Sequence, residues 1–106
     1  MKKRGRAAFR ALADETRLEI LGLLRNGSGT SGEIADQFES SWPTISRHLA
    51  ILRDAGLVTA ERNGQEIHYE LNTSVFDDLV QHLMTWTKPQ GRQRLPRRQR
   101  PRESEV

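Results

Sequence analysis

Two short amphipathic segments separated by a turn constrain the fold of this chain more than any other feature of its sequence. The first follows Thr30, which can form a capping box with Glu33 because each side chain can accept the backbone N–H of the other. The second follows Ser41, a residue suited to the N-cap, and tolerates Pro43 in its first turn. Its apolar stripe at i, i+4 and i+7 is formed by Ile45, Leu49 and Leu52. The pattern predicts two helices joined by a short turn, a helix-turn-helix.

A β-hairpin is predicted directly after this helix pair. Asn63-Gly64 is the strongest kind of short hairpin signal, and it joins strand-like runs at residues 57–62 and 65–71. In the second run apolar and polar residues alternate, which places the apolar ones on a single face of the strand. Those apolar residues are Ile67, Tyr69 and Leu71. The hairpin therefore has the position of a wing beside the helix pair.

Three more helices complete the predicted fold. Residues 7–13 and 15–25 form two helices before the pair, the second capped by Asp14, and residues 74–86 form a helix after the hairpin. The fold class is therefore mainly α with a β-hairpin, a winged helix-turn-helix in the order α-α-α-α-β-β-α. A chain of 106 residues is long enough for one such domain.

The basic charge of the chain is concentrated at its two ends. The formal net charge is +3, but residues 1–6 hold four basic residues and residues 88–106 hold one Lys and six Arg against two Glu. The central part is therefore acidic, and the basic pI of the whole chain is weak evidence for nucleic-acid binding. We expect residues 1–6 to form a basic N-terminal arm, residues 7–87 the folded domain, and residues 88–106 a disordered Arg-rich tail.

The outward face of the second helix of the pair carries residues that can contact DNA. In helix-turn-helix proteins the N-terminal half of this helix enters the major groove. Arg47 can donate two hydrogen bonds to a guanine edge, and Arg53 is placed to meet a phosphate. Arg62, beside the hairpin turn, can reach an adjacent minor groove. The predicted DNA contacts are Trp42, Pro43, Thr44, Ser46, Arg47, Arg53, Arg62, Asn63 and Gly64.

Each of these side chains can also have a role within the protein that involves no contact with DNA. Trp42 can pack against the turn between the helices, and Thr44 and Ser46 can stabilise the start of their own helix. Arg53 can pair with a neighbouring carboxylate, and Arg62 can simply be solvated in an exposed turn. The sequence leaves both interpretations open for each residue.

Residues 9–86 resemble the ArsR/SmtB family of bacterial repressors. The matching stretches are residues 9–21 (FRALADETRLEIL), 43–49 (PTISRHL), 52–58 (LRDAGLV) and 62–71 (RNGQEIHYEL). Glu15 departs from the family, which usually has proline after the aspartate. Within the family the chain is most similar to the metal-independent, SdpR-type autorepressors. The resemblance implies a homodimer built on the first and last helices that binds an inverted-repeat operator and represses transcription, with its own promoter as a candidate target.

The last helix is apolar over more than half of its circumference. A terminal helix in so small a domain cannot cover this surface by itself, so a partner helix from a second copy is expected. The alternative is that the same residues form ordinary monomer core. The predicted dimer interface consists of Phe9, Leu12, Val75, Leu79, Val80, Leu83 and Trp86.

No cofactor or catalytic activity is expected. The chain has no cysteine, which excludes thiolate metal sites. Asp78 and His82, at i and i+4, could offer two ligands in a metal-responsive repressor, but the other ligands that the family places near the helix end are absent; a surface Asp–His pair that supports the helix is the preferred interpretation. The sequence also lacks a phosphate loop and a nucleophile motif, so an enzyme is not expected.

The expected partners are double-stranded DNA and a second copy of the chain, with a regulatory protein as a further candidate. No apolar run approaches the roughly 20 residues that span a bilayer, so a cytoplasmic protein without membrane contact is expected. The alternative from another class is a protein-interaction module that does not bind DNA. Such a module would present an apolar face, whereas the outward residues Ser46, Arg47 and Arg53 are polar.

Overall fold

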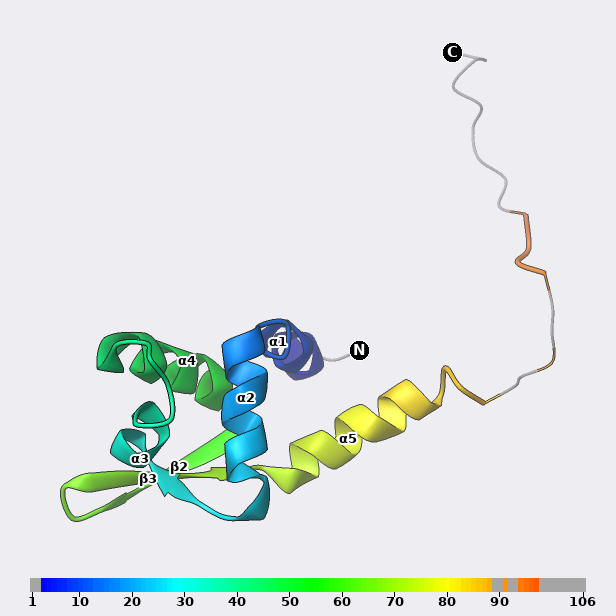
Figure 1. Cartoon of the computed structure of the whole chain (residues 1–106). Helices are drawn as coiled ribbons and strands as arrows, with labels where there is room; N and C mark the ends of the chain where they lie inside the picture. The colour runs from blue at the N-terminus through cyan, green and yellow to red at the C-terminus, as the bar shows by residue number, and fades with distance from the viewer. Residues whose placement is uncertain (1–2, 89–90, 92–93, 98–106) are drawn as a thin grey trace.

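The computed structural model describes residues 3–88, 91 and 94–97. Its elements follow the predicted order with one short strand and one 3₁₀ turn in addition (Figure 1). They are α1 (Lys3–Ala11), α2 (Glu15–Leu23), η1 (Leu24–Asn26), β1 (Gly29–Thr30), α3 (Ser31–Ala35), α4 (Trp42–Asp54), β2 (Val58–Asn63), β3 (Glu66–Leu71) and α5 (Thr73–Met84).

Side chains cap the starts of three helices as predicted. The Asp14 carboxylate accepts the backbone N–H of Arg17 at 3.0 Å, and this bond lowers the pKa of Asp14. Thr30 and Glu33 form the capping box with bonds of 2.9 and 3.1 Å, and the N–H of Thr30 lowers the pKa of Glu33. The N-cap of α4 is Ser41. Short-range hydrogen bonds thus fix where α2, α3 and α4 begin.

The sheet has three antiparallel strands in the order β1-β3-β2, whereas only the hairpin was predicted. β1 is two residues long and pairs Gly29 with Tyr69 and Thr30 with His68. A strand this short has no periodicity to detect, and its partner lies far along the chain. Thr30 is both the last residue of β1 and the N-cap of α3, so one residue joins the sheet to the helix pair.

The hairpin turn lies one residue later than predicted. Asn63 belongs to β2 and pairs with Glu66, which leaves Gly64 and Gln65 as the two-residue loop. Gly64 has a φ of 70°, and no non-glycine residue among those described has a positive φ. A type II′ turn needs a positive φ only at its first central position, whereas type I′ needs it at both. Glycine therefore occupies the first loop position, and Asn63 extends the strand.

The core lies between the helices and one face of the sheet. Figure 1 shows α2, α3 and α4 on one side of the sheet, with α5 leading away from it. Tyr69 of β3 is buried on this face, and Ile67 and Leu71 pack against the core, as their alternation predicted. The largest fully buried side chains are Ile20, Ile45, Leu49, Leu52, Leu57 and Val58.

Several helix boundaries differ from the predicted ones. α1 begins at Lys3 and so extends into the segment predicted to be an arm, because Lys and Arg have a high helix propensity. α2 ends at Leu23, and the 3₁₀ turn η1 replaces its predicted last turn. Most of the predicted tail at residues 88–106 lies outside the described residues. No described helix is long and apolar enough to cross a membrane.

Candidate nucleic-acid interface

The outward face of α4 is exposed and carries three polar side chains, those of Ser46, Arg47 and Arg53. Pro43, Ser46, Arg47, Ala50 and Arg53 are all exposed, on the side opposite the buried stripe of the helix. Within the described part of the chain, Arg47 makes neither a salt bridge nor a side-chain hydrogen bond. Its guanidinium is therefore available to an external acceptor.

The start of α4 is held against α3. Ser41 Oγ lies 2.9 Å from Thr44 Oγ1, so the Thr44 hydroxyl takes part in the cap, as the local alternative predicted. A Cβ atom added at Gly32 would lie 3.1 Å from Cη2 of Trp42, which places the indole ring directly on the backbone of α3. The same ring is still 54% exposed. Trp42 therefore packs on α3 and also presents a surface to solvent.

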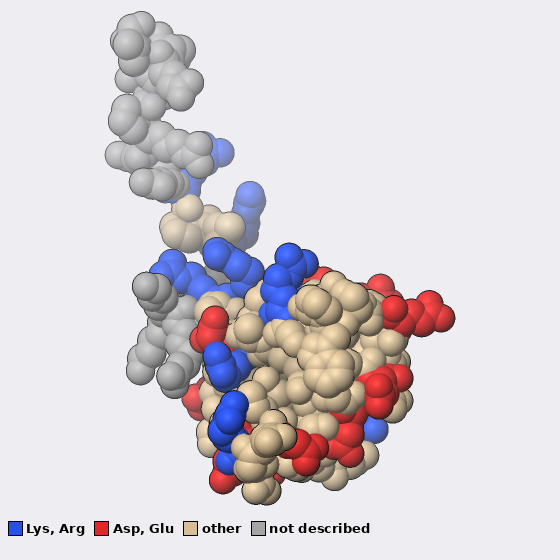
Figure 2. All heavy atoms as spheres, turned by 90° about the vertical axis from the view of Figure 1, so that its left-hand side faces the viewer, with Lys and Arg blue, Asp and Glu red and all other residues tan. Residues whose placement is uncertain are grey.

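The hairpin tip lies on the same side of the molecule as the N-terminal end of α4 (Figure 1). Arg62, Asn63 and Gly64 are exposed at this tip. Viewed from that side, most Lys and Arg lie along the left and upper edge of the molecule, where some Asp and Glu lie among them, and further Asp and Glu lie along the bottom and the right (Figure 2). The surface is therefore of mixed charge and not uniformly basic.

Residues 14–60 match a family model described as "Bacterial regulatory protein, arsR family". The transcriptional repressor SdpR of Bacillus subtilis is 44% identical over 78 residues, which cover 74% of this chain and 87% of SdpR. The chain belongs to the ArsR family. The arsenical resistance operon repressor of Staphylococcus aureus is 39% identical over 71% of this chain and 72% of its own length. Among solved structures, an ArsR-like transcriptional regulator from Rhodococcus sp. RHA1 superimposes with a TM-score of 0.71 at 30% identity, covering 79% of each chain.

This ArsR-family protein is a DNA-binding regulator of transcription with a winged helix-turn-helix fold. The relatives named above are regulators and not enzymes. The family, the fold class and the similarity to SdpR-type repressors are thereby confirmed. The individual DNA contacts on α4 and at the hairpin tip stay predictions.

The predicted dimer residues fall into two groups. Val75 and Leu79 are 9% and 7% exposed, and Phe9 and Leu12 pack against the core, so these four contribute to the monomer. Val80, Leu83 and Trp86 are 49%, 41% and 71% exposed, and Met84 is exposed beside them. α5 thus uses one side for its own domain and leaves an apolar side uncovered.

The candidate metal ligands of α5 are not arranged as a site. The His82 ring packs between Phe9 and Trp86, at centroid distances of 6.2 and 5.5 Å. The described residues contain neither an ion pair between Asp78 and His82 nor any group of three His, Asp or Glu side chains that could hold a metal. His82 therefore packs against aromatic rings, and the expected Asp–His pair is not formed.

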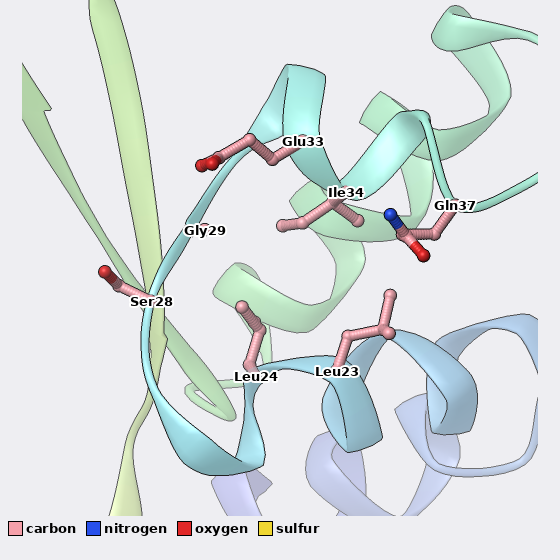
Figure 3. Close-up of a pocket in the computed structure, with 7 residues that line it drawn as sticks. All are labelled: Leu23, Leu24, Ser28, Gly29, Glu33, Ile34 and Gln37. Atoms are coloured by element: carbon pink, nitrogen blue, oxygen red, sulfur yellow. The ribbon is translucent and has the colours of Figure 1, made fainter.

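A hollow of about 200 Å³ lies between the end of α2 and α3 (Figure 3). Leu23, Leu24 and Ile34 form its apolar wall, and the Glu33 side chain points away from them. The Glu33 carboxylate accepts the backbone N–H of Thr30, and the other polar side chains that line the hollow are Ser28 and Gln37.

A polar contact between Arg17 and His48 connects α2 to α4, and the sequence analysis assigned neither residue to a site. Arg17 Nη1 lies 3.2 Å from His48 Nδ1, and Asp14 Oδ2 lies 3.8 Å from the same nitrogen. In the sequence His48 is too isolated from other candidate ligands to form a metal site. The sequence signal for this contact was the position of His48 directly before Leu49, at the edge of the buried stripe of the helix, where a polar side chain needs a hydrogen-bond partner.

Proposed function

We propose that two copies of this protein form a homodimer in the cytoplasm that represses transcription by binding an inverted-repeat operator. The observation that carries the proposal is the division of α4 into a buried apolar stripe and an exposed face bearing Ser46, Arg47 and Arg53. That division is the one a major-groove helix needs. The relatives SdpR and the arsenical resistance operon repressor are both repressors by name, which supports repression as the outcome.

In the proposed complex α4 enters the major groove with its N-terminal half. Arg47 donates to a guanine edge, and Arg53, further along the helix, meets a phosphate. Four residues lie where the helix enters the groove: Trp42, Pro43, Thr44 and Ser46. The hairpin tip, with Arg62, Asn63 and Gly64, reaches the adjacent minor groove.

The uncovered side of α5 supplies the proposed dimer contact. Val80, Leu83 and Met84 are neighbouring exposed apolar residues of α5, and Trp86 is exposed just after the helix, so the apolar surface is larger than a single exposed side chain. A twofold axis through this surface would bring each copy of α5 against the other. The two α4 helices would then lie about 34 Å apart, one turn of DNA.

A footprint on the DNA upstream of the gene tests the proposal. The protein, in buffer with a metal chelator, is expected to protect two half-sites whose centres are about 10 base pairs apart and related by inverted symmetry. A single unrepeated site, or equal binding to a scrambled fragment of the same composition, would reject the proposed function.

Deletion of residues 88–106 is expected to weaken DNA binding mainly at low salt and to leave operator preference intact. The deleted segment holds six arginines, whose contacts with phosphates would be independent of sequence and would release counterions. The measurement is operator affinity at several salt concentrations, for the full chain and the truncated one. Equal affinity and an equal salt slope for the two proteins would show that the tail has no role on DNA.

A further inference from the structure

A polar link joins the end of α1 to α4 through the side chain of Arg17. Arg17 Nε donates to the backbone carbonyl of Ala11 at 2.7 Å, and Arg17 Nη1 lies 3.2 Å from His48 Nδ1. A guanidinium can only donate, so Nδ1 of His48 must accept and its ring proton must lie on Nε2. The His48 side chain is only 12% exposed. Arg17 thus connects α1 to the helix whose outer face is proposed to contact DNA.

Packing between α1 and α4 is incomplete on the solvent side of this link. A groove of about 360 Å³ separates the two helices there. It is lined by Ala7, Arg10, Ala11, Arg17, Ile51, Asp54 and Ala55. Ala8 and Ala11 of α1 are buried in the core together with Leu52 of α4, so close packing holds the two helices on the inner side of the groove. On the solvent side, the hydrogen bonds of Arg17 are polar contacts that hold α1 against α4.

We propose that Arg17 and His48 are positioning residues whose hydrogen bond sets the placement of α4 for DNA recognition. The inference rests on the proposed placement of α4 in the major groove. His48 directly follows Arg47, so a shift of the backbone at His48 moves the guanidinium that is proposed to contact a guanine. A recognition site tolerates errors of only about 0.5 Å in such positions.

The experiment measures operator affinity of the full chain by fluorescence anisotropy. His48→Asn keeps an acceptor oxygen at the same position along the side chain. Arg17→Met keeps an unbranched stem but removes the donors, and His48→Leu removes the acceptor. Circular dichroism and the dimer fraction are recorded for every variant.

Arg17→Met and His48→Leu are each expected to lose about tenfold in operator affinity, and the double variant no more than either alone. His48→Asn, which keeps the acceptor, should bind like the wild type. Folded Arg17→Met and His48→Leu variants that bind like the wild type, or a His48→Asn variant that binds as weakly as His48→Leu, would overturn the inference alone. A wild-type protein without operator binding would reject the proposed function and this inference with it.

Discussion

Arg47→Ala is expected to remove most sequence-specific DNA binding and to leave non-specific binding and stability nearly unchanged. The side chain is exposed and makes no polar contact within the described residues, so its loss removes nothing from the fold. A bidentate contact of arginine with guanine contributes about 1–3 kcal/mol of discrimination, or roughly 5- to 150-fold in affinity. The measurement is the ratio of operator affinity to scrambled-DNA affinity at one fixed salt concentration.

Two further substitutions make the Arg47 result specific. Arg25→Ala removes the same charge from an exposed position in η1 and should leave the ratio unchanged. Arg47→Lys keeps the charge but loses the planar pair of donors, so it should retain non-specific affinity and only part of the discrimination. If Arg47→Ala and Arg25→Ala lower the ratio equally, Arg47 does not contact a base.

Leu83→Glu is expected to convert the protein from a dimer to a monomer. Leu83 is 41% exposed on the uncovered side of α5, so glutamate fits the isolated domain. At a twofold interface the substitution appears twice and places two carboxylates in an apolar contact, where each loses its hydration without a partner. Because a monomer occupies only one half-site, operator affinity should fall by at least about 100-fold. Sedimentation analysis gives the mass, and anisotropy gives the affinity.

Gln81→Glu is the matched control for the dimer prediction. It adds the same charge to α5 at an exposed position that lies about 160° around the helix from Leu83. This variant should remain a dimer and bind the operator like the wild type. A wild-type protein that sediments as a monomer, or a Leu83→Glu variant that remains dimeric, would show that this side of α5 is not the contact.

Features that depend on neighbours in the sequence could be predicted from the sequence alone. The caps at Asp14, Thr30 and Ser41 involve residues three positions apart, and the stripe of α4 depends only on the helix period. The family followed from the same local stretches, because the residues that position α3, α4 and the hairpin are close together in the chain.

Features that depend on distant contacts could not be predicted. β1 exists because Gly29 meets Tyr69 across the sheet, and Arg17 meets His48 across a separation of 31 residues. The sequence also did not show how α5 divides into a side that packs on the core and a side that stays exposed. Leu79 and Leu83 both belong to its apolar stripe, and periodicity does not show which of them the chain itself covers.

The double role of Thr30 has a consequence for the length of DNA that one subunit can read. Because this residue is paired to β3 and also caps α3, the hairpin and the helix pair are joined without a connecting loop. If α4 and the hairpin tip touch neighbouring grooves as proposed, we expect the distance between the two contacts to change little from one DNA sequence to another. Each subunit should then contact a stretch of DNA of fixed length, and inserting one base pair between its two contacts should lower operator affinity as much as changing a contacted base.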